Sequence, residues 1–176
     1  MMKKVDFSKP LLIQSVAFKE VYLRMVGEGI SKPLGSGAGT VNCQTTMDAA
    51  GQFKVHQRND GAVAFESIRY PGIYLRLAGN GIRSFAGAGA GLVNCQFGAD
   101  AWEHFKLHEQ PDGSYTIESA AFPNVYLRMD GNNPSKKNDN FGKVNCQYGA
   151  GSCEKFYLVN VPDTGKLQDL MGKMHM

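Results

Sequence analysis

The chain repeats one sequence pattern three times, and this repetition limits its possible folds more than any single motif does. Each copy holds a YLR motif, then a VNCQ motif, then a phenylalanine that begins an alternating segment. The tyrosines are 52 residues apart in both steps, and the cysteines are 52 and 51 residues apart. The three sets are Tyr22, Tyr74 and Tyr126; Cys43, Cys95 and Cys146; and Phe53, Phe105 and Phe156. A fixed period of this length indicates a supersecondary unit that buries its apolar face against neighbouring copies.

The repeat also predicts the domain boundaries. We expect a single domain over residues 1–162, built from repeats at about 11–62, 63–114 and 115–162, followed by a tail at 163–176. Within the tail, apolar residues at i, i+3, i+4 and i+7 form one helical stripe, and the tail docks on a partner, packs over the barrel opening or frays. The stripe consists of Leu167, Leu170, Met171 and Met174.

Hydrophobic and polar residues alternate inside each copy, which is typical of strands. Val21, Leu23 and Met25 share one face, whereas Tyr22 and Arg24 share the other. Lead-in strands are predicted at 13–18, 65–70 and 117–122, and turns at 59–61 and 111–113 join successive copies. About four short strands per copy, roughly twelve in all, predict an all-β barrel or sandwich with no helix between the strands.

Three four-stranded copies protect their edge strands best by closing around a threefold axis. The repeat resembles that of β-trefoil proteins. Residues 65–76, FESIRYPGIYLR, resemble the arabinose-binding domain of α-L-arabinofuranosidase B, and 117–128 carry a second copy. The order of YL, glycine-rich loop and NCQ is also similar to fascin-like trefoils that crosslink actin. The resemblance covers about 11–161 and implies a β-trefoil with pseudo-threefold symmetry.

Composition and charge argue against several classes of function. The net charge is +3 and no basic run is longer than a pair such as Lys136-Lys137, so nucleic acid is not an expected partner. No stretch approaches the length of a transmembrane helix, and no secretory signal is evident. Three of the four cysteines recur at one repeated position, which does not indicate a disulfide framework. We therefore expect a cytoplasmic, reducing environment and no cofactor.

The repeated cysteines allow two interpretations. Three equivalent strands could bring the thiolates together as a metal site on the threefold axis. The favoured alternative is a small buried residue beside valine on the inward face, since no histidine or acid recurs to support a metal. Cys153 breaks the symmetry and is predicted to be a free surface thiol.

The polar rows also allow two interpretations. The repeated tyrosines share the outward face with three repeated arginines, Arg24, Arg76 and Arg128. These side chains could form an aromatic and cationic platform that binds a sugar or an acidic partner. Alternatively, they form Tyr–Arg stacks that cover the flank of the barrel. The side-chain amides of the VNCQ motifs could form hydrogen bonds with sugar hydroxyls. More commonly, such amides form hydrogen bonds with the backbone of loops. In both cases the structural alternative is favoured. The amides are Asn42, Asn94 and Asn145 with Gln44, Gln96 and Gln147.

The resemblance to the arabinose-binding domain implies a sugar site. In that family an aspartate before the fourth strand and a histidine ending the YLR motif contact the sugar. Here Met25, Leu77 and Met129 occupy the histidine position, and Gly151 replaces the aspartate in the third copy. The ligand-binding residues that the resemblance implies, with their polar neighbours, are Asp48, Asp100, Asn42, Asn94, His56 and His108.

Nothing in the sequence predicts catalysis. The glycine-rich segments 35–39 and 87–91 lack the lysine and the following helix of a phosphate-binding loop, so they are predicted to be flexible connections. The third copy has a polar segment, 135–140, in their place. No Ser–His–Asp or Cys–His arrangement recurs, so we expect no enzyme. The four histidines, His56, His104, His108 and His175, occupy scattered positions.

Two functions remain. The first is a non-catalytic, lectin-like module that binds glycans through up to three repeated surface sites, with avidity from multivalent contact. The second is a fascin-like scaffold that crosslinks filaments or assembles with a protein partner. The glycan-binding module is favoured narrowly.

Overall fold

The computed structural model describes residues 4–45, 47–131 and 142–162. Each repeat contributes four strands within these ranges. The strands are β1 (Leu11–Ser15), β2 (Tyr22–Val26), β3 (Thr40–Gln44), β4 (Phe53–Gln57), β5 (Val63–Ser67), β6 (Ile73–Ala78), β7 (Leu92–Phe97), β8 (Phe105–Glu109), β9 (Tyr115–Ser119), β10 (Val125–Asp130), β11 (Gly142–Tyr148) and β12 (Lys155–Asn160). The tail stripe, His175, the Lys136-Lys137 pair and the polar segment 135–140 lie outside the described residues.

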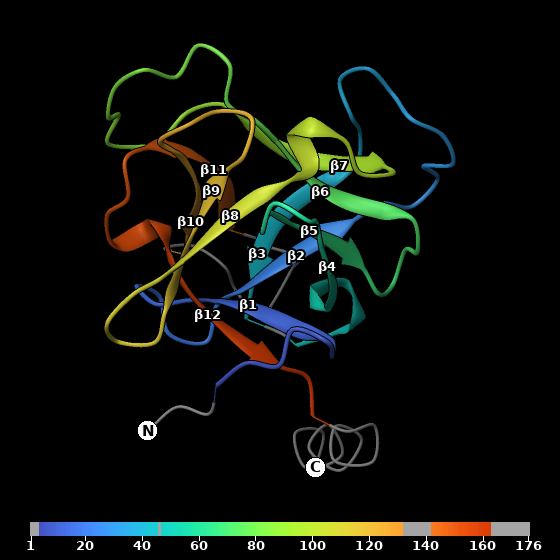
Figure 1. Cartoon of the computed structure of the whole chain (residues 1–176), viewed down its shortest axis with the longest axis horizontal. Helices are drawn as coiled ribbons and strands as arrows, with labels where there is room; N and C mark the ends of the chain where they lie inside the picture. The colour runs from blue at the N-terminus through green and yellow to red at the C-terminus, as the bar shows by residue number, and fades with distance from the viewer. Residues whose placement is uncertain (1–3, 46, 132–141, 163–176) are drawn as a thin grey trace.

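The first and fourth strands of the repeats form a closed barrel. β1 pairs with β4, β4 with β5, β5 with β8, β8 with β9, β9 with β12, and β12 with β1, all antiparallel. The closing pair joins the two ends of the domain, from Leu11 opposite Asn160 to Ser15 opposite Phe156 (Figure 1). Closure leaves the ring without a free edge.

The second and third strands form three hairpins that join one another. The hairpins are β2–β3, β6–β7 and β10–β11. Gly142 pairs with Cys43, and equivalent bridges join Ala38 to Cys95 and Ala90 to Cys146. A six-stranded barrel with a triplet of hairpins is a β-trefoil, which confirms the fold class predicted from the repeat.

Inward-facing residues from all three repeats fill one core. Phe53, Phe105 and Phe156, each near the start of a fourth strand, are fully buried. The hairpin strands add fully buried residues at equivalent positions, including Leu23, Leu75 and Leu127. These side chains come from the faces that the alternation assigned to the interior, so the pattern predicted the core correctly.

The repeated cysteines are buried core residues, as favoured from the sequence. Cys43, Cys95 and Cys146 are free thiols with no exposed surface. Each Sγ lies near a backbone carbonyl of another repeat, at 3.5 Å from Asp130 O for Cys43 and 3.6 Å from Val26 O for Cys95. Burial raises the pKa of each thiol to about 12. They act as small apolar fillers that also satisfy a carbonyl.

The lead-in strands end earlier than the sequence predicted. β1, β5 and β9 stop at Ser15, Ser67 and Ser119 rather than three residues later. The hydroxyl oxygen of Ser67 accepts a hydrogen bond from the Tyr70 N–H at 2.9 Å, and the other two serines bond equivalently. The side chain thus supplies a local partner for the backbone and starts a turn.

A short 3-10 helix precedes each fourth strand, although no helix was expected. The helices are η1 (Ala49–Gly51), η2 (Ala101–Glu103) and η3 (Ser152–Glu154). Asp100 Oδ1 accepts from the Ala101 N–H at 3.0 Å, and the Asp100 N–H donates to Glu103 Oε1 at 2.8 Å. Such capping needs only a few residues and leaves no helical periodicity to detect.

The glycine-rich loops pack against the next repeat, and the expectation of flexible connections was wrong. The Ala90 N–H donates to Cys146 O at 2.8 Å, which fixes the loop backbone. Gly89 has a φ of +72°, and a Cβ there would lie 2.7 Å from Cys146 O. Gly37 has a φ of +69°, and a Cβ there would lie 2.7 Å from Cys95 O. Glycine permits this close approach because it has no side chain.

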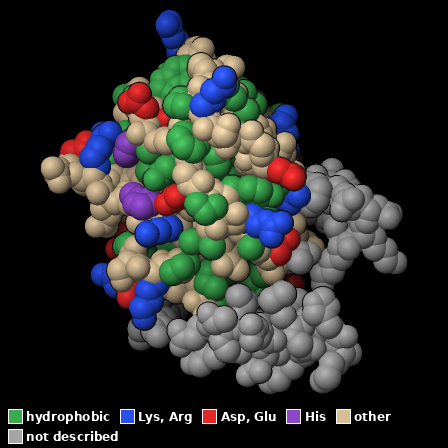
Figure 2. Space-filling view, turned by 90° about the vertical axis from the view of Figure 1, so that its right-hand side faces the viewer, with side chains coloured by type: hydrophobic (Ala, Val, Ile, Leu, Met, Phe, Trp, Pro, Cys, Tyr) green, Lys and Arg blue, Asp and Glu red, His purple; other side chains and the backbone are tan. Residues whose placement is uncertain are grey.

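The surface carries interspersed charges. On the face in Figure 2, basic and acidic side chains alternate with hydrophobic and neutral ones. Within the described ranges, no helix has the length and apolar character needed to cross a membrane. The large hydrophobic side chains exposed in these ranges are Ile68, Phe85, Leu92 and Phe97.

Candidate functional site

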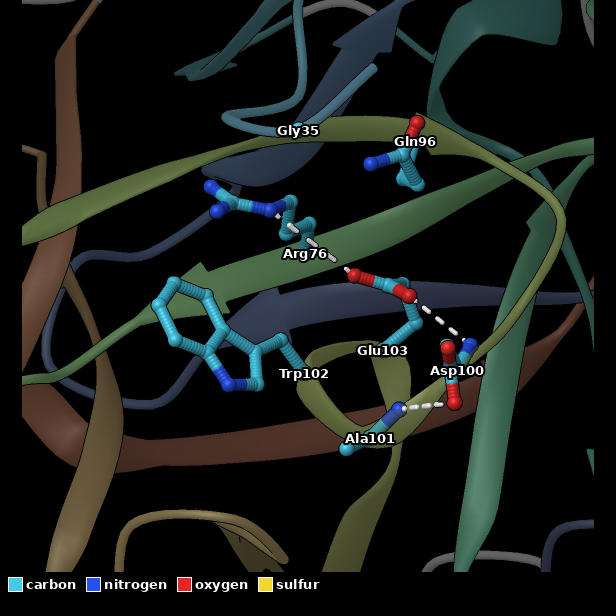
Figure 3. A pocket seen from close by; sticks show the side chains of 7 residues that line it. All are labelled: Gly35, Arg76, Gln96, Asp100, Ala101, Trp102 and Glu103. Atoms are coloured by element: carbon cyan, nitrogen blue, oxygen red, sulfur yellow. Dashed lines mark hydrogen bonds and ion pairs between the residues drawn. The ribbon is translucent and has the colours of Figure 1, made fainter. Parts of the chain in front are cut away.

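A pocket of about 250 Å³ lies where a loop of the first repeat meets the second repeat. The loop before β3 supplies Gly35, β6 supplies Arg76, and β7 supplies Gln96. The opposite wall is the segment from Asp100 to Glu103, which contains η2 (Figure 3). At about 30 Å³ per molecule, this volume holds roughly eight waters, so it suits one small polar ligand.

Arg76 is a buried cation in the pocket lining. Its side chain is 5% exposed, although the alternation places it on the strand face away from the core. Nη1 donates to Asn94 Oδ1 at 3.2 Å, and Nε lies 3.8 Å from Glu103 Oε2, beyond hydrogen-bonding distance. Among the residues that the structure describes, Asn94 is the one hydrogen-bond acceptor of this guanidinium. Because Arg76 lines the pocket, its other N–H donors can bond an acceptor that enters there.

Glu103 lies between Arg76 and the backbone of Asp100 (Figure 3). Its carboxylate is 4% exposed, and Oε1 accepts the Asp100 N–H at 2.8 Å. Burial raises the pKa of Glu103, while the Asp100 N–H and the positive charge of Arg76 act in the opposite direction. Glu103 thereby provides a local counter-charge for Arg76.

Asp100 provides the accessible carboxylate of the pocket. The residue is exposed, and its Oδ1 accepts from the Ala101 N–H at the start of η2. Within the described part of the chain Oδ2 accepts no hydrogen bond, so it can accept one from solvent or from a ligand hydroxyl.

Trp102 contributes the aromatic surface. The Cζ of Arg76 lies over its ring, 4.7 Å from the centroid. Phe122, from the β9–β10 turn of the third repeat, meets the ring at 4.9 Å with an interplanar angle of 67°. Trp102 is half-buried, so one part of the indole packs in the protein and another part is accessible.

The amides of the second and third repeats bond loop backbone, which confirms the favoured interpretation at these positions, whereas Gln44 of the first repeat donates to Asp48 Oδ1 at 3.2 Å. Gln96 Oε1 accepts from the Leu34 N–H at 2.8 Å, and its Nε2 donates to Leu34 O. Asn94 Nδ2 donates to Ser36 O at 3.1 Å. Gln147 and Asn145 make the same bonds to Ala86 and Ala88, one repeat later. These amides position the loops that border the pockets.

The three repeats differ at the pocket positions. Trp102, Glu103 and Asp100 correspond to Ala50, Gly51 and Asp48 in the first repeat and to Cys153, Glu154 and Gly151 in the third. Glu154 does pair with Arg128, whose Nε lies 3.9 Å from Oε2. The second repeat therefore combines an aromatic ring, a buried carboxylate and an exposed carboxylate, whereas neither other repeat does.

His56 and His108 form a separate, repeated arrangement. His56 Nε2 lies 2.7 Å from Glu66 Oε1, and Glu66 Oε2 accepts the Gly72 N–H at 2.7 Å. In the same way, His108 Nε2 lies 2.7 Å from Glu118 Oε1, and Glu118 Oε2 accepts the Asn124 N–H at 2.7 Å. The histidines were described as scattered, which was wrong for this pair, because they are 52 residues apart.

The repeated tyrosines accompany these histidines rather than the arginines. The ring of Tyr74 lies 5.7 Å from that of His56, and Tyr126 lies 6.4 Å from His108. Tyr22 lies opposite Gln14 of β1, at the register position where Tyr74 and Tyr126 lie opposite Glu66 and Glu118. Arg76 and Arg128 are buried, so they do not form an exposed platform with the tyrosines. Arg76 stacks on Trp102 rather than on a tyrosine.

The residues implied by the resemblance therefore fall into different places. Asp100 lines the pocket, whereas Asp48 caps η1 by accepting the Ala50 N–H at 3.1 Å. Asn42 accepts from Arg24 Nη1 at 3.3 Å, as Asn94 does from Arg76. His56 and His108 bond the neighbouring repeat's glutamate and do not line the pocket.

Sequence reasoning missed Trp102, Glu103 and the two glutamates that bind histidines. Two signals were present. The tryptophan is the single one in the chain, and Glu103 recurs 51 residues later as Glu154. Glu66 and Glu118 recur at the main period of 52. A search for polar residues at the repeat spacing would have found these acids.

Comparison with known proteins supports the fold. No family model matches the chain, and no curated protein sequence is significantly similar to it. A solved structure of a mosquitocidal holotoxin matches 89% of this chain with a TM-score of 0.67 at 10% identity. This chain spans 18% of the toxin chain. ThreeFoil, a designed 3-fold symmetric protein, matches 89% of this chain and 100% of its own with a TM-score of 0.62 at 14% identity. These similarities confirm the fold alone.

Proposed function

We propose that this protein is a non-catalytic carbohydrate-binding module and that the pocket of the second repeat holds the sugar. The observation that carries the proposal is the combination of Trp102, Arg76 and Asp100 around a cavity of about 250 Å³. The cavity is too small for an extended chain and suits one sugar ring, such as the end of a glycan.

Each of these residues offers a contact that a sugar ring needs. The accessible part of Trp102 offers an aromatic surface for the apolar C–H face of a ring. The open N–H donors of Arg76 suit ring or hydroxyl oxygens, and Asp100 Oδ2 accepts from hydroxyl groups. Donors and acceptors thus face one cavity, as polyhydroxylated ligands require.

The proposal is of binding without catalysis. Two carboxylates line the pocket, as they do in glycosidases, which use a pair of free acids. Here Glu103 Oε1 is engaged by the Asp100 N–H and Oε2 faces Arg76. We infer from these two contacts that Glu103 serves as a structural partner of Arg76 rather than as a catalytic acid.

The proposal differs from the sequence expectation in the number of sites. The sequence predicted up to three similar sites, including Asp48, Asn42 and Tyr22 in the first repeat. Ala50 and Gly51 replace the ring and the buried acid there, and Cys153 replaces the ring in the third repeat. We therefore propose one principal site.

A glycan array followed by titration calorimetry of the best ligand tests this function. We expect saturable binding with one site per chain, loss of most affinity in Trp102→Ala, and a weaker but clear loss in Asp100→Asn. Cys153→Ala and Asp48→Asn change the equivalent positions in the other repeats and should leave the affinity unchanged.

The same samples test the alternative. If no glycan binds while the protein pellets with actin filaments, the carbohydrate proposal fails and the scaffold is favoured. Binding that survives Trp102→Ala but is lost in Asp48→Asn would move the site to the first repeat. Product release from a bound oligosaccharide would contradict the non-catalytic assignment.

A further inference from the structure

The charges around the pocket are unequal. Arg76 carries the one positive charge in the lining, whereas Asp100 and Glu103 carry two negative charges. The two charges that are buried, Arg76 and Glu103, face each other at 3.8 Å and largely offset each other. The charge that a ligand meets at the accessible wall is therefore that of Asp100.

Arg76 has fewer carboxylates around it than its counterpart in the third repeat. In the third repeat the corresponding Arg128 has two carboxylates nearby, with Asp130 Oδ2 4.0 Å from Nη2 and Glu154 Oε2 3.9 Å from Nε. Ala78 occupies the Asp130 position beside Arg76, so the second carboxylate is absent there. The guanidinium forms one hydrogen bond to a described residue, and it lines the pocket, where a ligand oxygen can approach its other N–H groups.

We propose that Arg76 anchors a neutral hydroxyl or ring oxygen and that the pocket selects uncharged sugar rings against acidic ones. This inference rests on the proposed function and names its ligand class. A carboxylate that reached Arg76 would compete with Glu103 for the same cation and lie near Asp100. The carboxylate would also lose its hydration in a site with a net negative charge. A neutral hydroxyl has no charge to desolvate and is not repelled by Asp100 or Glu103.

Glu103 is the positioning residue in this scheme. It touches Arg76 rather than the ligand, and it also holds η2 through the Asp100 N–H. Glu103→Gln keeps an acceptor for that N–H and preserves the capping box while removing one negative charge. Asp100→Asn likewise keeps a side-chain oxygen for the cap. Both variants change the charge of the pocket with little change in shape.

The experiment uses matched pairs of one ring with and without a carboxylate. Galactose and galacturonic acid, glucose and glucuronic acid, and mannose and mannuronic acid are titrated into the full-length protein at low salt and pH 7. We expect the neutral member of the pair that binds to be preferred by at least about tenfold. Glu103→Gln and Asp100→Asn should each reduce that ratio by about fivefold or more, chiefly by strengthening the acid.

Controls separate this inference from a general effect of charge. Glu154→Gln removes the equivalent carboxylate beside Arg128 and should leave the ratio unchanged. Thermal melts check that each variant is folded. Because Asp100 is exposed, Asp100→Asn remains a valid test even if Glu103→Gln unfolds.

The outcomes are distinct. If a uronic acid binds as well as or better than its neutral partner, the charge selection is wrong although the binding function stands. If the preference exists but neither Glu103→Gln nor Asp100→Asn alters it, the pocket charges do not cause it and the inference is overturned. If no sugar in the pairs or on the array binds, the proposed function itself fails.

Discussion

The guanidinium of Arg76 lies over the indole of Trp102, with Cζ 4.7 Å from the ring centroid. The contact joins strand β6 to the short helix η2, and Phe122 extends it to the third repeat at 4.9 Å. A residue proposed to bind ligand is thus also part of the packing between repeats. Stability and binding should therefore change together at this position, but by different amounts.

Trp102→Ala should lower the free energy of unfolding by about 1–3 kcal/mol, because it removes a half-buried ring and its cation–π contact. Urea denaturation followed by tyrosine fluorescence or circular dichroism measures the change. Trp102→Phe retains a ring and should recover more than half of the loss. Equal stability of the alanine variant and the unmodified protein would show that the stack contributes little.

Phe105→Ala should cost about 3–5 kcal/mol, because it leaves a cavity at a fully buried position that contacts the core. The ring of Phe65 lies 5.8 Å away and loses its aromatic neighbour. Lys106→Ala, one residue later on the exposed face, should stay within about 0.5 kcal/mol of the unmodified protein. A small effect at Phe105 would contradict the core described above.

Gly89→Ala should destabilise the protein by more than about 1 kcal/mol, for two reasons. The residue has a φ of +72°, which alanine rarely adopts, and its Cβ would lie 2.6 Å from Asn145 Oδ1 and 2.7 Å from Cys146 O. Gly87→Ala is the matched control, since a Cβ there meets no atom within 4 Å. Similar melting temperatures for the two variants would show that the loop is not held against the third repeat.

Acidification should weaken the links between repeats that Glu66 and Glu118 make. Burial alone would raise the pKa of Glu66, but the Gly72 N–H and the His56 ring outweigh burial and hold the pKa below its usual value. Glu118 is lowered in the same way by Asn124 and His108, again against burial. A lowered carboxyl pKa contributes stability above the unfolded value of about 4.3, and this contribution is lost as the pH falls through the folded value.

Melting temperatures measured from pH 7 to pH 2 check this dependence. The double variant Glu66→Gln and Glu118→Gln should be less stable than the unmodified protein at pH 7, and the difference should shrink below about pH 4. Glu109→Gln, an exposed change on β8, serves as the control for general charge effects. A difference that stays constant across the whole range would contradict the role of these two ionised carboxylates.

The native protein should react with a thiol reagent at Cys153 alone. Cys43, Cys95 and Cys146 are buried with a pKa of about 12, whereas Cys153 is half-buried on η3. Mass spectrometry after brief alkylation at pH 8 should show one adduct before denaturation and four after it. Rapid labelling of Cys95 in the folded protein would contradict the closed core.

Sequence reasoning predicted the strands and the core rows well, because both follow from local alternation. Val21, Leu23 and Met25 are buried, as their shared face required. The same reasoning placed Arg76 outside the core, which is correct for the strand but did not show that the loop before β3 covers it. That loop belongs to another repeat, and strand alternation carries no information about what packs on the outer face.

The candidate site was predicted only in part for the same reason. Asp100 was named from the family resemblance, whereas Trp102 and Glu103 were not, since they lie in a helix of three residues without a detectable period. Asn94 and Gln96 were named as amides with two interpretations, and the backbone of residues 34–36 decided between them. Contacts of this kind link residues about 60 positions apart, so they depend on how the repeats meet.

The sequence by itself determined that this protein is a closed, threefold β structure with dry cysteines, because a fixed period and a two-residue alternation specify strands and their inward faces wherever the copies lie. The tertiary structure alone decided which side chains of the three differing copies lie together. Closure brings the loop before β3 against the second repeat, and in the described part of the chain that contact places Trp102, Arg76 and Glu103 around one pocket. The strand pattern is a local property, whereas a pocket depends on which side chains the closed barrel places opposite one another.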